Sequence, residues 1–329
     1  MALSATVVAA VPGTSWAATA ESASLATTGT VRFEPLVAGA GGLTVAGTGS
    51  FRGAIEVRPN GRGLAVVNDV ALEEYVRGID EVPHSWPAAA LQAQAIAART
   101  YAAHKTVTGD QRWRAVGADI CATSTCQVYR GLDTEKRAQG YGWLPAVEAT
   151  AGRALLEGGQ PILASYSSTA NGPRAMSQNG ALAMANEGRS SAEILAAFYG
   201  IQPSLAPARL PKAIKVAVVM STSSVKVSTK TPLRVVDAGG TPLATPGTGE
   251  WAVVAGAGGV RLVPPETGPV APVTEVAPAP VPEAVLRRPT RVVTAAAPLS
   301  RPWGWTLASL ALTVAAGTST ITLHRRRLT

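Results

Sequence analysis

Ten prolines lie within the 39 residues from Pro264 to Pro302, and this density limits where the chain can fold. Proline lacks a backbone N–H and fixes φ, so neither a long helix nor a central strand runs through such a stretch. We therefore expect 264–302 to be an extended linker, which at about 3.1 Å per residue reaches on the order of 100 Å. The globular part of this 329-residue chain is then expected before the linker.

The two ends of the chain have the composition of export and anchoring segments. Residues 1–20 combine an apolar run with small-residue cleavage patterns, which is typical of a signal peptide, although the usual basic start is missing. Residues 303–323 carry no charge and as a helix span about 32 Å, close to the thickness of a bilayer core. Arginines in the tail 324–329 favour the cytoplasmic side. The sequence predicts a secreted ectodomain anchored by one transmembrane helix; the alternatives are a flexible N-terminus and a buried core helix.

The net charge of +8 lies mostly near the C-terminus. From Glu283 onward there are seven arginines and one acid, so the preceding 282 residues have an excess of only two positive charges. A nucleic-acid-binding protein needs a basic stripe on a folded surface. The composition therefore argues against nucleic acid as a partner.

Strand and helix patterns alternate in the first half of the chain. Alternating apolar residues on both sides of Pro59-Asn60-Gly61 predict a β-hairpin. A short amphipathic helix is expected next, ending near Gly78. The Ala-rich segment 87–104 predicts a longer helix with Ser85 as its N-cap candidate. The predicted fold class is α+β, with short strands and a central Ala-rich helix.

A second region of strand pattern precedes the linker. Apolar and polar residues alternate within 210–263, and Gly239-Gly240 and Gly247-Thr248-Gly249 mark turns. This predicts a small β-rich module that follows a core domain at 31–202.

Arg99 is a charged residue on the otherwise apolar, Ala-rich helix. A buried guanidinium needs partners. Arg99 is therefore either one half of a structural ion pair or part of a ligand site, and the residues alone leave both interpretations open.

Six sequence motifs carry a specific resemblance. They are Val67–Gly78 (VNDVALEEYVRG), Glu81-Val82-Pro83, Ala90–Tyr101 (ALQAQAIAARTY), Cys126–Gly131 (CQVYRG), Ala146–Gly152 (AVEATAG) and Tyr166–Gly172 (YSSTANG). Through these motifs the chain resembles the SpoIID/LytB family, which comprises the stage II sporulation protein D and the amidase enhancer LytB.

The resemblance implies peptidoglycan chemistry. SpoIID-like proteins are lytic transglycosylases that cut glycan strands, preferably strands without stem peptides, between N-acetylmuramic acid and N-acetylglucosamine. The family's catalytic acid falls on Glu81 and its conserved arginine on Arg99, and no cofactor is implied. The candidate substrate-binding residues on the matched motifs are Arg99, Gln127, Tyr129, Tyr166, Ser167 and Ser168.

A single carboxyl group suffices for such a reaction. It protonates the leaving glycosidic oxygen and then, as a carboxylate, removes the proton from the muramic C6 hydroxyl, which is the nucleophile. We expect an apolar wall of Val82, Pro83 and Trp86 to raise the pKa of Glu81, and a nearby Asp80 charge to reinforce the shift. Without the resemblance, Glu81 is most simply an exposed loop acid.

Cys121 and Cys126 are the two cysteines of the chain. In an exported protein, a disulfide between them is the default expectation. Some SpoIID proteins use this loop for a zinc site with a nearby histidine, but His84 and His104 both lie outside it. Two thiolates and a distant histidine make an incomplete tetrahedral set, so we predict a disulfide and no metal.

The sequence departs from the family after Tyr166. Family members place several tens of residues before a downstream His-Gly-x-Gly-Met-Ser-Gln-Tyr-Gly-Ala motif, whereas here Gly172–Ala181 (GPRAMSQNGA) follows at once. The leading interpretation is a membrane-anchored lytic transglycosylase. The alternative is a non-catalytic, wall-binding enhancer of an N-acetylmuramoyl-L-alanine amidase, which gains weight because the deletion could remove one wall of the glycan groove. Both interpretations predict peptidoglycan glycan strands as a partner and an ectodomain that faces the cell wall; the enhancer adds a cell-wall amidase. A purely structural surface domain is disfavoured by the polar residues in the motifs.

Overall fold

The computed structural model describes residues 25–27, 29–37, 41–170, 172–257 and 259–265. The predicted signal peptide, the transmembrane segment, the tail and the linker beyond residue 265 lie outside these ranges. Among the helices inside them, none combines the length and the apolar character that a membrane crossing requires. The described residues form a mixed α+β fold, as the sequence predicted.

Eleven strands form one large sheet. Its main path runs β1-β17-β16-β15-β2-β5-β6-β14-β7, and β3 pairs with both β15 and β4. The strands are β1 (Leu25–Thr27), β2 (Val31–Pro35), β3 (Leu43–Val45), β4 (Gly49–Phe51), β5 (Ala54–Asn60), β6 (Gly63–Ala71), β7 (Ile120–Cys121), β14 (Ala213–Thr222), β15 (Ser224–Val236), β16 (Pro242–Gly256) and β17 (Gly259–Val263). Three short pairs lie apart from it: β8 (Arg153–Ala154) with β13 (Ser204–Leu205), β9 (Leu156–Glu157) with β10 (Gln160–Pro161), and β11 (Ser165–Ser167) with β12 (Ala175–Ser177).

The predicted β-hairpin is confirmed by β5 and β6. The two strands pair in antiparallel register out to Asn60 opposite Gly63, which leaves Gly61 and Arg62 as a two-residue turn. Gly61 has φ of +60°, and a tight hairpin turn favours glycine because such turns need this left-handed backbone.

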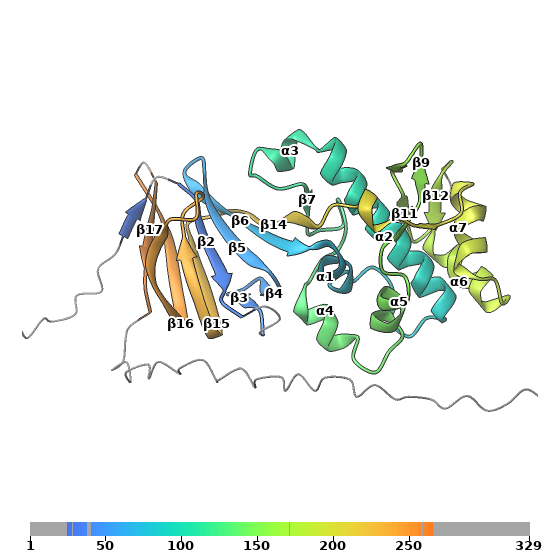
Figure 1. Cartoon of the computed structure of the whole chain (residues 1–329), viewed down its shortest axis with the longest axis horizontal. Helices are drawn as coiled ribbons and strands as arrows, with labels where there is room; N and C mark the ends of the chain where they lie inside the picture. The colour runs from blue at the N-terminus through green and yellow to red at the C-terminus, as the bar shows by residue number, and fades with distance from the viewer. Residues whose placement is uncertain (1–24, 28, 38–40, 171, 258, 266–329) are drawn as a thin grey trace, which may run out of the picture. The chain divides into compact units, whose positions relative to one another are not determined.

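The strands within 210–263 do not form a module of their own. Strand β14 pairs with β6, β15 pairs with β2, and β17 pairs with β1, so they complete one sheet with strands that precede residue 72. Figure 1 shows β6 and β14 running together from the other strands toward the helices. Local alternation predicted the strands themselves, but the partner of each strand is a long-range choice that alternation does not specify.

Seven α-helices and one 3₁₀ segment lie in the described ranges. They are α1 (Leu72–Arg77), α2 (Ala88–Thr108), α3 (Gln111–Arg114), α4 (Leu132–Arg137), α5 (Trp143–Ala149), α6 (Gln178–Asn186), α7 (Ser191–Tyr199) and the 3₁₀ turn Pro207–Arg209. The Ala-rich helix α2 contacts α1, α5, α6 and α7. It begins at Ala88, one residue later than expected, with Pro87 rather than Ser85 at its N-cap, and it ends at Thr108 rather than at residue 104.

Helix α2 is buried on two faces, which explains its many alanines. Leu91, Ala95 and Ala102 belong to the main apolar core, while Ile96 and Ala97 belong to a second cluster with α6 and α7. Helices approach one another closely only where side chains are small, so alanine on both faces lets α2 lie between two layers.

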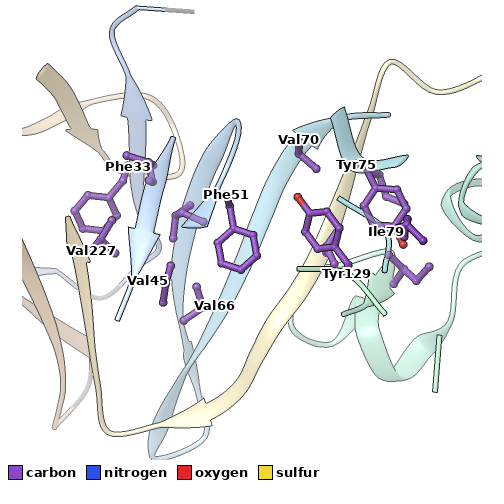
Figure 2. Close-up of a cluster of buried hydrophobic side chains, with 14 of the residues drawn as sticks. Phe33, Val45, Phe51, Val66, Val70, Tyr75, Ile79, Tyr129 and Val227 are labelled. Carbon is purple, nitrogen blue, oxygen red and sulfur yellow. The ribbon is translucent and has the colours of Figure 1, made fainter. Parts of the chain in front are cut away.

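The main core extends without a break from the sheet to the turn that precedes α2. Figure 2 shows the Phe51 ring beside Tyr129, and Tyr129 beside Tyr75. The ring centroids are 5.8 Å apart in the first pair and 4.8 Å in the second. Aromatic pairs at this spacing add about 0.5–1.5 kcal/mol beyond their buried area. The neighbouring rings of Phe51, Tyr129 and Tyr75 therefore hold the segment after α1, which contains Glu81, against the sheet.

Candidate functional site

Glu81 lies just after α1, in a segment held against residues 128–130. Ile79 and Tyr129 form an isolated antiparallel bridge. The Asp80 N–H donates to the Val128 carbonyl at 2.9 Å, and the Val128 N–H donates to Glu81 Oε1 at 2.5 Å. The Glu81 carboxyl group therefore accepts the hydrogen bond that a backbone carbonyl would accept if the bridge continued. This hydrogen bond fixes the direction of the carboxyl group.

Glycine is required where this segment leaves α1. A Cβ atom at Gly78 would lie 2.5 Å from Cε2 of Tyr129 and 2.7 Å from the Cα of Gly131. Any larger residue at position 78 would push the end of α1 away from residues 129–131. The Gly78 at the end of the predicted short helix thus permits the close backbone contact on which the Glu81 geometry depends.

The pKa of Glu81 is raised above its ordinary value. Burial is the largest cause, because it penalises the charged carboxylate, and the Asp80 charge raises the pKa further. The hydrogen bond from Val128 N–H opposes both, since it stabilises the carboxylate. The Asp80 contribution agrees with the sequence-based expectation. The expected apolar wall differs in part, because Val82 is buried but Pro83 is exposed.

Three tyrosines are close enough to Glu81 for its charge to affect them. The pKa of Tyr75, Tyr101 and Tyr166 is raised in each case, first by burial, and the Glu81 carboxylate adds to each shift. The Tyr101 and Tyr166 rings have centroids 6.4 Å apart. These phenols therefore remain neutral within reach of the Glu81 charge.

Gln127 connects two of these tyrosines. It accepts a hydrogen bond from the Tyr75 hydroxyl at 2.8 Å, and its amide nitrogen lies 2.6 Å from the Tyr166 hydroxyl and 3.2 Å from the Ala98 carbonyl. Gln127 has no exposed surface. In this conformation it positions Tyr166 rather than contacting a substrate, which corrects the expectation that it binds substrate directly.

Arg99 is also fully buried, and its partner is Glu73. The guanidinium binds the carboxylate through two bonds, Nε–Oε1 at 2.9 Å and Nη2–Oε2 at 2.7 Å. It further donates to the carbonyls of Arg153 at 3.3 Å and Val147 at 3.4 Å. Of the two interpretations that the sequence left open, the geometry favours the structural ion pair, and the substrate-binding role is corrected accordingly.

The remaining candidates differ in accessibility. Tyr129 is 4% exposed and donates its hydroxyl to Asn68 Oδ1 at 2.7 Å, so it is likewise a core residue rather than a substrate contact. Tyr166 is half-buried, and Ser167 and Ser168 are exposed. Strand β11 therefore carries Tyr166, whose hydroxyl is bound by Gln127, and the exposed Ser167.

A small hollow adjoins Tyr101 on the side of the disulfide loop. It has a volume of about 80 Å³ and is lined by Tyr101, Lys105, Asp110, Arg112, Trp113, Ile120, Thr125 and Cys126. The charges of Asp110, which also lines this hollow, and of Glu81 both raise the pKa of Tyr101. Larger hollows lie elsewhere, over β15 and β16 and beside the β9–β10 pair.

The shortened segment forms a compact connection in the structure. Strands β11 and β12 pair in parallel, with Tyr166 opposite Met176. Arg174, in the connection, has φ of +57° and binds Glu157 through two nitrogen–oxygen contacts of 3.0 and 2.8 Å. The residues after the departure from the family pattern thus still return to the site and continue into α6.

Cys121 and Cys126 form a disulfide with a Cα–Cα distance of 5.5 Å. Cys121 lies on β7, which pairs with β14, and the loop leads directly to Gln127 and Val128. His84 lies 3.3 Å from Asp80, and His104 bonds the Pro161 carbonyl. Within the ranges described, no three His, Cys, Asp or Glu residues are grouped as metal ligands.

Replacing both cysteines by serine is expected to lower the free energy of unfolding by about 2 kcal/mol, because the loop from 121 to 126 loses its closure in the unfolded chain. Urea unfolding of the variant and of the oxidised protein measures the difference. Reduction of the native protein should give the same loss, and addition of reductant to the double serine variant should change nothing. Equal stability of all four samples would contradict a disulfide in the folded protein.

Sequence reasoning missed three parts of this site. Tyr75 and Tyr101 lie inside the quoted motifs, but their convergence on Glu81 depends on how α1 and α2 pack. Val128 contributes only a backbone N–H, which has no side-chain signal. The available clue was the Cys126–Gly131 motif. It matches the family although it lies far from Glu81 along the chain, and the simplest explanation is that the two segments lie close together in space.

Comparisons with known proteins place the similarity on the segment that carries Glu81. The family model for SpoIID, described as stage II sporulation protein, matches residues 60–156. That segment contains Glu81, Arg99, Gln127, Tyr129 and both cysteines, but ends before Tyr166.

Three curated proteins illustrate the similarity. The chain is 35% identical over 115 residues to stage II sporulation protein D of Bacillus subtilis (strain 168), covering 32% of this chain and 34% of that protein. It is 37% identical over 93 residues to the amidase enhancer of the same organism, covering 28% of this chain and 11% of the enhancer. An uncharacterized protein of Brachyspira hyodysenteriae is 34% identical over 94 residues, covering 28% and 24%. The matched segment spans about a third or less of each relative.

Proposed function

Because residues 60–156 carry a domain of the SpoIID/LytB family, which has a cell-wall-related function, we propose that this protein is a peptidoglycan lytic transglycosylase with Glu81 as its acid and base. The observation that carries the proposal is the Glu81 carboxyl group. It is partly buried, it is fixed by the Val128 N–H, and its pKa is raised by burial and by the Asp80 charge. Such a carboxyl group holds its proton at a higher pH than an exposed glutamate.

The proposed reaction uses the same carboxyl group twice. Protonated Glu81 gives its proton to the glycosidic oxygen as the bond to the muramic C1 atom breaks. The Glu81 carboxylate then takes the proton from the C6 hydroxyl as that oxygen bonds to C1. The products are a free hydroxyl on the leaving glycan and a 1,6-anhydro ring on the muramic acid, and Glu81 regains its initial state.

The surroundings of Glu81 suit a reaction that develops positive charge on a sugar. Tyr101 and Tyr166 are neutral phenols beside the carboxyl group, and Ser167 is exposed next to Tyr166 on β11. The exposed Ser167 hydroxyl is available to bind a saccharide by a hydrogen bond. The buried Gln127 holds the Tyr166 hydroxyl through its amide group.

We further propose that the ectodomain faces the cell wall and is anchored in the membrane through residues 303–323. The uncharged stretch and the arginines that follow it support this assignment. The uncharged stretch and the arginines after it lie outside the residues that the structure describes.

Product analysis tests the proposed reaction. The purified full-length chain, incubated with glycan strands freed of stem peptides, is expected to release saccharides that end in 1,6-anhydromuramic acid. Mass spectrometry distinguishes them from hydrolysis products, which are heavier by one water. Saccharides with reducing muramic ends would instead show a hydrolase, and unchanged strands would favour the second candidate.

The second candidate is a non-catalytic enhancer of a cell-wall amidase. The similarity to the amidase enhancer of Bacillus subtilis and the shortened segment after Tyr166 favour it. It predicts binding to glycan strands without cleavage, together with faster release of stem peptides when an N-acetylmuramoyl-L-alanine amidase is added.

A further inference from the structure

A hollow of about 630 Å³ is lined by residues of β3, β4, α4, β15 and β16. Figure 1 shows β3 and β4 lying between β15 and α4. Apart from Lys136, the lining residues lie outside residues 60–156, the segment that matches the family model. The hollow is therefore a feature of this chain that the matched segment does not explain.

Four polar side chains form a row across the strands at this hollow. Ser228 lies opposite Glu250 of β16 and opposite Thr44 of β3. Thr44 lies opposite Ser50 of β4, and their hydroxyl oxygens are 2.9 Å apart. Residues directly opposite one another point to the same face of a sheet, so the four side chains share one face. At about 4.8 Å between strands, this polar row is about 14 Å long.

The apolar neighbours of the polar row explain why it faces outward. Val45 and Val227, which follow Thr44 and precede Ser228, are 2% and 0% exposed. Successive residues of a strand point to opposite faces, so burial of the two valines in the core turns the hydroxyl groups toward the solvent. Thr44 is exposed, and Ser50 and Ser228 are half-buried. The polar row is therefore accessible to a ligand.

Most charged groups at the hollow are paired with one another. Lys136 Nζ lies 3.2 Å from Asp133 Oδ1, and Lys226 Nζ lies 2.7 Å from Glu250 Oε1. Lys230 adds one further positive charge to the lining. A polyanion is attracted by a cluster of like-charged cations, whereas hydroxyl groups both donate and accept hydrogen bonds. The hollow therefore fits a polymer rich in hydroxyl and amide groups better than a polyanion.

Helix α4 connects this hollow to the segment that carries Glu81. Lys136 lines the hollow, and Arg137, the next residue, lies 2.7 Å from Asp80, which precedes Glu81. Helix α4 also contacts β4, which carries Ser50 of the polar row. A long polymer bound in the hollow is therefore separated from the Glu81 segment by one short helix.

We propose that this hollow is a second saccharide-binding site, which holds a glycan strand through the polar row while Glu81 acts on another part of the strand. The site takes no part in bond cleavage, so it goes beyond the proposed reaction and does not depend on it. Among the described residues, no aromatic side chain lines the hollow, so hydrogen bonds rather than ring stacking hold the sugar. The hydroxyl and N-acetyl groups of a glycan are the partners of Thr44, Ser50 and Ser228.

Lysine modification measures occupancy of the hollow separately from the Glu81 site. Full-length protein that carries Glu81→Gln is acetylated briefly with and without the hexamer of N-acetylglucosamine, and mass spectrometry gives the rate at each lysine. A titration of this protection gives Kd. At a saccharide concentration ten times Kd, about one hollow in eleven is empty, so acetylation of Lys230 should slow about tenfold. The exposed Lys212, which does not line the hollow, should react at an unchanged rate.

Hydroxyl-removing variants identify the groups that bind the saccharide. Thr44→Val, Ser50→Ala and Ser228→Ala together should raise the Kd measured at Lys230 by about tenfold or more, because three hydrogen-bonding groups are lost. Thr44→Val alone should give a smaller increase, and valine suits a strand, which protects the fold. Urea unfolding midpoints show whether each variant remains folded.

The matched control is Thr245→Val combined with Ser221→Ala and Ser223→Ala. It makes the same chemical changes at exposed positions that do not line the hollow. It should leave the Kd unchanged. An increase as large as that of the hollow variant would show a general effect of hydroxyl removal and would overturn the second site.

The remaining outcomes separate the second site from the proposed reaction. A folded hollow variant with the native Kd would overturn the role of the polar row. Protection of Lys230 by a glycerol phosphate polymer but not by the saccharide would overturn the saccharide assignment in favour of a polyanion. A Glu81→Gln protein that still releases anhydromuramic ends would overturn the role of Glu81 and leave the second site standing, because protection of Lys230 is measured without cleavage.

Discussion

Replacement of Glu81 by glutamine is expected to lower the rate of glycan cleavage by about a hundredfold to ten thousandfold, which is the usual contribution of a positioned acid or base. Glutamine has nearly the same shape and retains an oxygen that can accept the Val128 N–H bond. It has no proton to give to the glycosidic oxygen and no basic site for the C6 proton. Release of anhydromuramic ends measured at a fixed protein concentration gives the loss directly.

Stability provides the control for this variant. Because burial raises the pKa of Glu81, the folded state binds more protons than the unfolded state between the two pKa values, and stability falls as pH rises through that window. Glutamine does not ionise, so the variant should be at least as stable as the native protein at pH 7. The difference should vanish in acid, where Glu81 is protonated in both states. A variant that loses both activity and stability at pH 7 would contradict this account.

The second large effect concerns Glu73, the partner of Arg99. Its replacement by alanine is expected to lower the free energy of unfolding by about 3–5 kcal/mol, the usual cost of leaving a buried charge unpaired. Arg99 is fully buried and would retain only two long contacts, to the carbonyls of Arg153 and Val147. The Gly152 N–H, which donates to Glu73 at 3.0 Å, would also lose its acceptor. Urea unfolding measures the loss.

The reverse change separates a structural role from a substrate contact. Arg99→Met removes the buried charge and leaves Glu73, whose side chain is 41% exposed and can be hydrated. It should therefore destabilise the protein less than Glu73→Ala, and the double variant should be more stable than Glu73→Ala alone. Normal stability of Glu73→Ala combined with loss of glycan binding in Arg99→Met would restore Arg99 as a substrate contact.

The sequence predicted Glu81 as the candidate acid but only part of its surroundings. Asp80, whose charge raises the pKa of Glu81, is its neighbour in sequence, whereas Val128, whose N–H opposes the shift, lies beyond the disulfide loop. Tyr101 on α2 and Tyr166 on β11 come from other parts of the chain. Arg99, Gln127 and Tyr129 lie on matched motifs, and on that basis the resemblance predicts them as substrate contacts. A motif does not distinguish a residue that touches a ligand from one that holds its neighbour, and their burial makes that distinction.

Local structure could be predicted because it depends on nearby residues, whereas the pairing of strands that are distant in sequence could not. The hairpin turn at Gly61 and the helix end at Gly78 follow from backbone preferences of nearby residues. The pairing of β14 with β6 joins residues about 150 positions apart, as in Ala213 opposite Ala71. Nothing in the alternation of either strand specifies that partner, so the strands of 210–263 were expected to form a module of their own.

The position of β14 also determines when this protein can finish folding during its synthesis. Strand β14 lies between β6 and β7, and it bonds both Asp119 and Ala122, so it fixes the chain on which the Val128 N–H is presented to Glu81. A ribosome makes the glutamate long before it makes this strand. A chain released early, at residue 202, would contain every motif of the site and still lack the strand that holds it together. Folding of the site is therefore expected to be complete only after β14 has been made.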